Sequence, residues 1–407
     1  MSGTHRPRTV IRVEKNIVGP ELPRSKTVRS RRLSDYPHVA APHLAVAKRL
    51  SSPLLMGPPI CDELIAFVQH TFTEEEADVV RCLSIMRGLT AEQIAAKARR
   101  PLDEVQPVLD RLALQKRAIG CRGSAEQRRY QLMPIMPGIF EMVLIGESPD
   151  TLSDWHRRFA DLFETLFETG YMLDYQGLQP PMVRFLPVGR IAASHPMALP
   201  CEQLEVVLDR FEVFGVGHCQ CRMSSDPCGQ GCGRPLKVCT AMGTWAEQAI
   251  ATGAMQRISR QNVLEIKREA ESHGLVTWLL NVDSTTGQAS CSCCGCCCKA
   301  MRMVTEFNAP GMMAPPHFMP RFDAGTCKHC GQCARACQMG AITVNMQQKH
   351  LHHEPARCIG CGLCQLACDK QRAVRMEPVP EFRIPYKSWY AARLRSVPSL
   401  LRTSWRV

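Results

Sequence analysis

Two runs of cysteine near the end of the chain constrain it more than any other feature. They read CKHCGQCARACQ, beginning at Cys327, and CIGCGLCQLACD, beginning at Cys358, and both have the spacing C-x2-C-x2-C-x3-C. Cysteine thiolates hold cubane iron–sulfur clusters at this spacing. The first three cysteines of such a run wrap one cluster, and the fourth opens a short helix that leads away. Glycines between the ligands allow sharp turns that present amide N–H groups to sulfur.

Over residues 318–376 the chain resembles the bacterial-type ferredoxin domain with two [4Fe–4S] clusters. The resemblance implies two ligand sets, which are Cys327, Cys330, Cys333 and Cys368 for one cluster, and Cys358, Cys361, Cys364 and Cys337 for the other. The family usually has proline after each fourth cysteine, where this chain has Gln338 and Asp369. This departure bears on the local turn and not on the ligation. Zinc held by CxxC pairs is the rival interpretation, and disulfides are a weaker one.

The remaining cysteines fall into two further clusters and four isolated positions. Of the 23 cysteines, eleven lie between residues 219 and 298. They are Cys219, Cys221, Cys228, Cys232, Cys239, Cys291, Cys293, Cys294, Cys296, Cys297 and Cys298. Thiolates this close repel one another and readily share a bound cation. We therefore expect a third metal centre, preferably iron–sulfur, with Cys219, Cys221, Cys239 and Cys294 as trial ligands.

Other chemistry at this cysteine-rich module stays open at the level of sequence. Zinc in a thiolate-rich site is the main rival, and a dithiol redox pair or a soft-metal trap are further alternatives. Arg222 either donates to cluster sulfur or is a surface charge. The isolated cysteines, which are Cys61, Cys82, Cys121 and Cys201, are most simply buried apolar residues.

Residues 70–135 show the clearest helical periodicity. Capping boxes at Thr73 and Thr90 predict helices over 73–87 and 90–98, and a third helix is expected over 102–118. With a returning strand at 130–132, this order resembles a winged helix-turn-helix. Because the third helix begins with Asp103 and Glu104, which face phosphate unfavourably, a protein-contact role is favoured over DNA binding.

The middle of the chain gives mixed patterns. Strands are expected over 141–146, 183–191 and 275–280, and helices over 151–169, 202–214, 244–252 and 260–273. The apolar stripe of the 151–169 helix predicts a core face, without a cofactor role.

The formal net charge of +12 is concentrated in the two ends of the chain. Residues 1–50 carry eleven Lys/Arg against three Asp/Glu, and residues 371–407 carry eight against two. The first end is expected to be a solvated basic tail. The second mixes Trp389, Trp405 and arginines, with Pro398 interrupting a helix, and either docks on the body or lies on a membrane surface. No apolar run of 18 residues and no signal-peptide pattern is present, which predicts a cytoplasmic, at most membrane-peripheral, protein.

The expected fold class is α+β and multidomain. Its expected parts are a basic tail (1–55), a winged-helix-like region (70–135), a mixed α/β cysteine-rich module (136–310), a ferredoxin-like dicluster domain (318–376) and a basic aromatic tail (377–407). Residues 60–376 together resemble longer bacterial ferredoxin-domain proteins, which implies iron–sulfur binding and electron transfer.

The leading functional hypothesis is an electron carrier that works with a flavoprotein or metalloenzyme. No nucleotide-binding or hydrolase motif is visible, so a catalytic residue is not assigned and a stand-alone enzyme is less expected than a redox component. The alternatives are a redox- or metal-sensing DNA-binding regulator and an oxidoreductase whose active centre is the extra cluster. Nucleic acid is not the expected partner.

Overall fold

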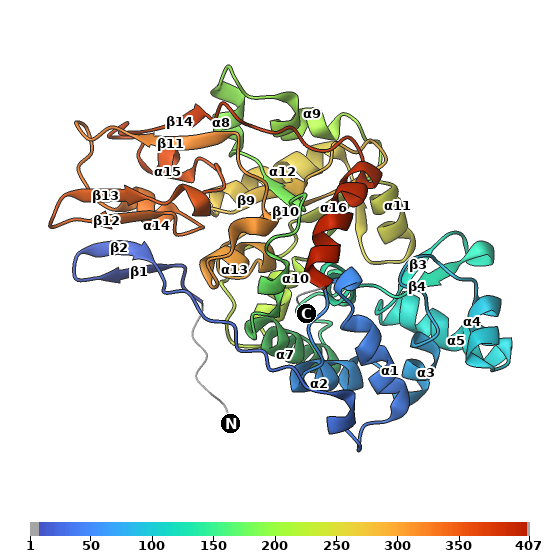
Figure 1. Ribbon diagram of the computed structural model, residues 1–407. Coiled ribbons are helices and arrows are strands. Elements are labelled where there is room, and N and C mark those ends of the chain that lie inside the picture. The colour runs from blue at the N-terminus through green and yellow to red at the C-terminus, as the bar shows by residue number, and fades with distance from the viewer. Residues whose placement is uncertain (1–7, 405–407) are drawn as a thin grey trace.

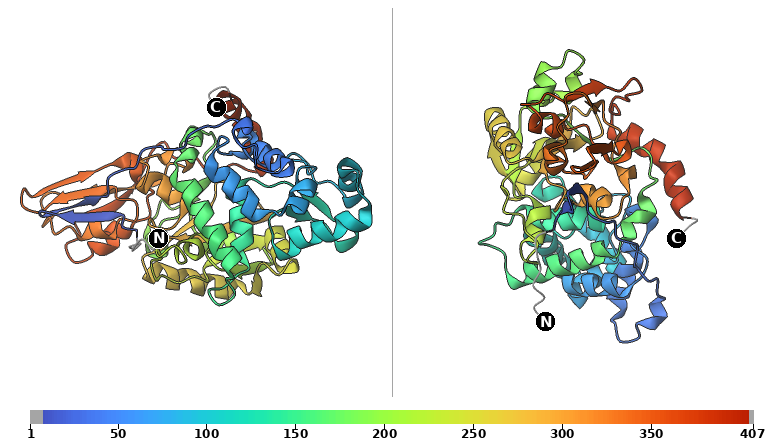
Figure 2. Two further views of the ribbon diagram at one scale, coloured as in Figure 1. Left: turned by 90° about the horizontal axis from the view of Figure 1, so that it is seen from below. Right: turned by 90° about the vertical axis from the view of Figure 1, so that its left-hand side faces the viewer.

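The computed structural model describes residues 8–404 and shows a mixed α/β protein with several antiparallel sheets (Figure 1). A helical region, a central sheet and a C-terminal region of short strands and helices follow one another along the chain. Figure 2 shows the helical and C-terminal regions at opposite ends of the molecule. The central sheet lies between them and carries the cysteine-rich module.

The helical region packs around one large apolar core. Its elements are α1 (Ala41–Leu50), α2 (Asp62–Thr71), α3 (Glu74–Val80), α4 (Ala91–Ala98), α5 (Leu102–Asp110), β3 (Gly120–Arg122), β4 (Arg129–Gln131), α6 (Phe140–Ile145) and α7 (Asp154–Glu168). Both predicted capping boxes are confirmed, with Thr73 and Thr90 as N-caps. Three helices followed by a hairpin occur in the expected order, and membership of the winged-helix class stays a prediction.

Several elements of this region differ from their sequence patterns. The helix that begins after Thr73 ends at Val80, because the hydroxyl of Ser84 accepts hydrogen bonds from the N–H groups of Met86 and Arg87 and forms a turn. The third helix has α-geometry only to Asp110 and continues as a wider turn over Arg111–Gln115. The strand expected over 141–146 is wrong. It is helix α6, whose Phe140 stacks on Phe163 of α7 at 3.8 Å, so tertiary packing overrides the local pattern.

The central sheet has six strands in the order β5-β9-β10-β7-β6-β8, and all its pairs are antiparallel. The strands are β5 (Val183–Phe185), β6 (Phe214–Gly217), β7 (Cys239–Gly243), β8 (Gln256–Ile258), β9 (Val276–Leu280) and β10 (Gly287–Cys293). The helices around it are α8 (Gly189–Ser194), α9 (Leu204–Leu208), α10 (Gln220–Ser225), α11 (Thr244–Ala251), α12 (Arg260–Ser272) and α13 (Lys299–Thr305). The predicted helices over 244–252 and 260–273 and the predicted strand over 275–280 are confirmed.

Two expectations for this sheet are only partly right. The strand predicted over 183–191 ends at Phe185, because Pro187 cannot donate to a ladder, and α8 follows. The helix predicted over 202–214 is limited to Leu204–Leu208, since Phe214 pairs with Met242 and Ile258 as part of β6.

The C-terminal region contains two small sheets. Its elements are β11 (Phe318–Phe322), α14 (Gln332–Ala336), β12 (Ile342–Asn345), β13 (His350–His353), α15 (Leu363–Ala367) and β14 (Val374–Pro378). The β12–β13 hairpin is extended by a second hairpin from the other end of the chain, formed by β1 (Ile11–Glu14) and β2 (Ile17–Pro20), with Val18 opposite Val344 (Figure 1).

This hairpin corrects the expectation that residues 1–55 form a solvated tail. Of the residues described, 8–55 include β1, β2 and α1, and Val18 is fully buried in the core of the C-terminal region. The apolar residues of β1 and β2 are too few for a periodic signal. Their sheet partner is more than 300 residues away in the sequence, so the sequence pattern gives no sign of it.

The last described element is α16 (Trp389–Ser404), which lies on the outside of the body (Figure 2). The hydroxyl of Ser399 accepts a hydrogen bond from the N–H of Gln179 at 3.2 Å and donates to its carbonyl at 3.0 Å. Pro398 lies within this helix, so its expected interruption is wrong, while Trp405 lies outside the described residues. No helix among residues 8–404 is long and apolar enough to cross a membrane.

Candidate metal centres

Two small cavities in the C-terminal region bring the cysteines of the two runs together. The first cavity is lined by Cys327, Cys330, Cys333 and Cys368. The second is lined by Cys337, Cys358, Cys361 and Cys364. The fourth cysteine of each run thus lines the cavity of the other run, which is the grouping that the ferredoxin resemblance implies.

The backbone around these cavities suits thiolate ligands. The N–H of His329 donates to Cys327 Sγ at 3.4 Å, and the N–H of Ala341 donates to Cys337 Sγ at 3.3 Å. Gly331 and Gly362, at φ of 75° and 80°, begin α14 and α15 in a left-handed conformation that favours glycine. Burial raises the pKa of Cys358 to about 12, so a bound metal has to displace the proton of this thiol.

The thiols of the cysteine-rich module come from four elements that meet at one end of the central sheet. Cys219 and Cys221 lie at the start of α10, and Cys239 begins β7. Cys291 and Cys293 lie on one face of β10, and Cys298 is the N-cap of α13. The loop between β10 and α13 supplies Cys294, Cys296 and Cys297, and the loop after α10 supplies Cys232.

Six of these thiols form a closed ring, here called the thiol ring. The side chain of each lies next to those of two neighbours, in the order Cys219, Cys221, Cys298, Cys293, Cys291, Cys239 and back to Cys219. Hydrogen bonds accepted from Cys239 and Cys293 lower the pKa of Cys291 to about 5. The neighbouring thiol of Cys219 raises the pKa of Cys221.

Four other thiols form a compact group, here called the thiol tetrahedron. Its members are Cys232, Cys294, Cys296 and Cys297, and all four sulfurs lie within 4.8 Å of one another. Every pair of these side chains is in contact. The Sγ atoms of Cys232 and Cys294 are 4.0 Å apart, and those of Cys296 and Cys297 are 3.8 Å apart. A group of this shape can hold a metal ion.

Buried cations lie against both groups. Arg222, which is 1% exposed, donates to the carbonyl of Ser292 at 3.2 Å and to Cys294 Sγ at 3.7 Å. Its buried Nε has no hydrogen-bond partner among the described residues, so it is available to an anionic group. Lys267 donates to the carbonyl of Ser290 at 3.1 Å. Burial lowers the pKa of Lys267, and the thiols of Cys291 and Cys239 oppose this shift.

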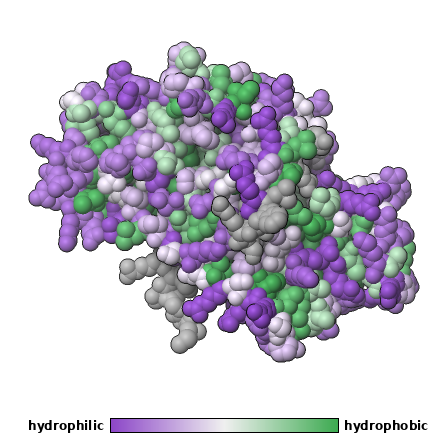
Figure 3. All heavy atoms as spheres, viewed as in Figure 1, coloured by the Kyte–Doolittle hydropathy of each residue, from purple (hydrophilic) through white to green (hydrophobic). Residues whose placement is uncertain are grey.

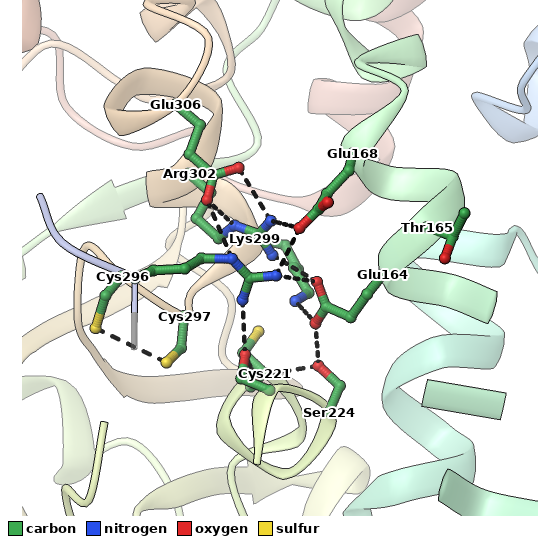
Figure 4. A network of polar contacts seen from close by, with 12 residues as sticks. Glu164, Thr165, Glu168, Cys221, Ser224, Cys296, Cys297, Lys299, Arg302 and Glu306 are labelled. Atoms are coloured by element: carbon green, nitrogen blue, oxygen red, sulfur yellow. Dashed lines mark hydrogen bonds and ion pairs between the residues drawn. The ribbon is translucent and has the colours of Figure 1, made fainter. Parts of the chain in front are cut away.

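A buried network of ion pairs joins the elements that carry the thiols (Figure 4). Glu164 of α7 accepts from Lys299 and, at 2.7 Å, from Arg302, both of α13, and from the hydroxyl of Ser224 of α10 at 2.6 Å. Arg8 contacts the same carboxylate at 3.0 Å. Although burial opposes it, the surrounding cations hold the pKa of Glu164 well below its usual range. The network therefore fixes α10 and α13 relative to α7.

Among the contacts between the module and the C-terminal region, one joins two cysteine loops. The side-chain oxygen of Gln338, the residue after Cys337, accepts a hydrogen bond from the N–H of Gly295 at 3.1 Å. A Cβ atom on Gly295 would lie 1.8 Å from the carbonyl oxygen of Gln338, so only glycine permits this approach. Gln338 stands where related domains usually have proline, and its role in docking the cysteine loop was not anticipated from the sequence.

Other expected residues lie apart from these groups. Cys228 has no thiol partner among the described residues, and its surroundings are Glu164 and Asp161, which together with burial raise its pKa to about 12. Of the four isolated cysteines, Cys61, Cys82 and Cys201 are buried, as isolated apolar residues would be, whereas Cys121 is only half-buried. Lys267 and Glu164 were missed, since a charged residue in a helix gives no sequence signal for burial.

Comparison with known proteins supports the iron–sulfur character of the C-terminal region. Residues 319–369 match the family model of the 4Fe-4S dicluster domain. An uncharacterized ferredoxin of Methanocaldococcus jannaschii is 35% identical over 81 residues, which are 19% of this chain and 46% of that protein. The chain thus spans less than half of this relative, and no solved structure matches the chain significantly. The dicluster match implies [4Fe–4S] clusters in this region, and the cysteine groups beside it indicate additional iron–sulfur or metal sites.

Proposed function

We propose that this protein relays single electrons between a redox partner and a metal centre in its cysteine-rich module, through two [4Fe–4S] clusters. When bound, such clusters accept and release one electron at a time. Cys327, Cys330, Cys333 and Cys368 would hold the outer cluster, and Cys337, Cys358, Cys361 and Cys364 would hold the inner one. The observation that carries the proposal is the contact between Gln338 and Gly295, because it joins an inner-cluster ligand loop to the loop between Cys294 and Cys296.

We expect electrons to pass between the outer cluster and a partner protein at the first cavity. Cys330 is exposed, whereas Cys364 in the second cavity is buried. Lys328 lines this cavity, and Lys370 and Arg372 flank another lining residue, Gln371. These three cations are exposed, and the neighbouring carboxylates include Asp369 and Asp323. The end of the molecule that carries β12 and β13 is mainly hydrophilic in Figure 3. We expect an acidic surface of a flavoprotein or metalloenzyme to dock here.

The DNA-binding alternative finds little support in the helical region. Arg100 pairs with Glu75 and Glu104, and Arg111 pairs with Glu76. Since cations that neutralise phosphates supply most of the affinity for DNA, arginines already paired with carboxylates are poorly placed for that role.

The relay is tested by rapid mixing of the anaerobic full-length protein with a low-potential reductant, followed by freeze-quenching and electron paramagnetic resonance. In the wild type, the ferredoxin clusters and the module centre should exchange electrons during the time course. Gly295→Ala should slow this exchange at least tenfold, because the new methyl group forces the two loops apart. Gly177→Ala, which places a methyl group in open space, is the matched control.

Two results would contradict the relay. One is a module that holds no redox-active centre. The other is an exchange rate in Gly295→Ala equal to that of the wild type when the metal content of the two proteins is the same.

A further inference from the structure

We infer that the cysteine-rich module holds two metal centres of different nuclearity, a single tetrahedral ion in the thiol tetrahedron and a multinuclear centre in the thiol ring. The inference rests on the proposed function only in requiring that the module binds metal. The inference assigns six thiols to one centre and four to the other, although the sequence presents them as one group. Cys228 is assigned to neither centre.

The thiol tetrahedron has the dimensions of a mononuclear site. A zinc or iron ion bound to thiolates at about 2.3 Å in tetrahedral geometry places the sulfurs about 3.8 Å apart. The sulfurs of Cys232 and Cys294 are 4.0 Å apart and those of Cys296 and Cys297 are 3.8 Å apart, close to this value. All six pairs of the four side chains are in contact, as the edges of a tetrahedron require.

Charge supports the same assignment. Four thiolates around a divalent ion leave two negative charges, which are costly to bury without compensation. Arg222 donates to Cys294 Sγ at 3.7 Å, and Arg234 donates to Cys296 Sγ at 3.5 Å. Two guanidinium groups therefore meet the two excess charges, each on a different ligand.

The thiol ring does not have this shape. Unlike the thiol tetrahedron, the ring supplies, among the described residues, no three sulfurs that all lie within 4.8 Å of one another. Six ligands in an octahedron would each touch four others, so the ring is too open for one ion.

The order of cysteines in the CSCCGCCC loop matches the division. Cys291 and Cys293 share one face of β10 and belong to the ring, and Cys298 returns to it at the start of α13. Between them, Cys294, Cys296 and Cys297 belong to the tetrahedron. The chain therefore crosses from one centre to the other at 293–294 and again at 297–298.

The test compares iron, zinc and acid-labile sulfide per chain in anaerobically purified full-length proteins. Because cubane-type clusters contain equal numbers of iron and sulfide, iron plus zinc in the wild type should exceed sulfide by about one. The variant Cys296→Ala/Cys297→Ala should lose about one metal ion and no sulfide. The variant Cys239→Ala/Cys291→Ala should lose two or more iron ions with matching sulfide and keep the single ion. Cys228→Ala, the control, should lose neither.

The outcomes separate this inference from the relay. Extra metal that is matched throughout by sulfide, or that disappears together with sulfide in Cys296→Ala/Cys297→Ala, would overturn the mononuclear site and leave the relay standing. No metal beyond the roughly eight iron ions of two cubane clusters would overturn both. The wild-type excess of metal over sulfide needs no variant, so it decides the matter even where a variant fails to fold.

Discussion

The C-terminal region and the cysteine-rich module both gather thiols, but they do so by different physical means. In the C-terminal region two short runs within 42 residues supply all eight thiols, and tight turns hold them apart around two cavities. In the module, ten thiols from elements between residues 219 and 298 gather in two groups, the thiol ring and the thiol tetrahedron. Local spacing defines the first arrangement, and tertiary packing defines the second.

The two regions also compensate negative charge differently. Around the ferredoxin cavities, backbone N–H groups such as those of His329 and Ala341 point at sulfur. In the module, the buried side chains of Arg222 and Lys267 lie among the thiols. A site compensated by backbone depends little on any one side chain, whereas a site compensated by buried cations depends strongly on each.

The largest expected effect is the loss of a whole cluster from the C-terminal region. Cys337→Ala should remove about four iron and four sulfide per chain, because it takes a ligand from the second cavity. Cys368→Ala should remove the other cluster, although Cys368 is in the second run. Electron paramagnetic resonance of the reduced double variants Cys337→Ala/Cys358→Ala and Cys337→Ala/Cys327→Ala would check the grouping. The grouping predicts that Cys337→Ala/Cys358→Ala loses one cluster and that Cys337→Ala/Cys327→Ala loses both. The opposite result would show that each run holds its own cluster.

Removing a buried cation should disturb the module alone. Arg222→Met leaves buried thiolates without their partner, and we expect a loss of about 3–5 kcal/mol in the free energy of unfolding, with much lower metal occupancy in the module. The two ferredoxin clusters should remain, as their iron and sulfide would show. Arg222→Lys, which keeps the charge, should retain more metal than Arg222→Met. Equal occupancy in both variants would show that charge is not the cause.

The ion-pair network should make stability depend on pH. The pKa of Glu164 is held below its usual range, so the unfolded chain binds more protons than the folded one in acid. Its contribution is full at pH values well above the unfolded pKa of about 4.3, begins to fall near that pH, and is lost only as the pH falls through the much lower folded pKa. Glu164→Gln should cost about 3 kcal/mol at neutral pH, and this cost should shrink progressively as the pH falls from about 5 toward about 2, measured by urea unfolding. The exposed Glu74→Gln is the control, and a cost independent of pH would contradict this account.

The smallest expected effect concerns the contact between the two regions. Gln338→Leu removes one hydrogen bond to Gly295, worth about 1 kcal/mol, without adding bulk to the backbone contact. We expect normal metal content and a modest slowing of electron exchange, less than in Gly295→Ala. Freeze-quench spectroscopy would measure the rate of electron exchange. A larger slowing than in Gly295→Ala would show that electron exchange depends on the side chain of Gln338 more than on the close backbone approach.

The same difference between the regions explains what the sequence could predict. The grouping of Cys327 with Cys368 follows from spacing and family resemblance, and the capping boxes at Thr73 and Thr90 depend on neighbours three residues away. The N-terminal hairpin and the burial of Glu164 depend on residues more than a hundred positions apart, and the division of the module depends on residues more than sixty positions apart. Tertiary packing also overrides a local strand pattern at the segment that begins with Phe140, which is a helix because Phe140 stacks on Phe163.

The central claim is that metal is bound in the cysteine-rich module as well as in the ferredoxin cavities. The most direct measurement is anomalous diffraction at the iron and zinc edges from crystals of the anaerobically purified full-length protein. This account predicts peaks in both ferredoxin cavities, a compact peak at the thiol tetrahedron and further density at the thiol ring. Peaks confined to the two ferredoxin cavities, with ordered and unmodified thiols in the module, would contradict it.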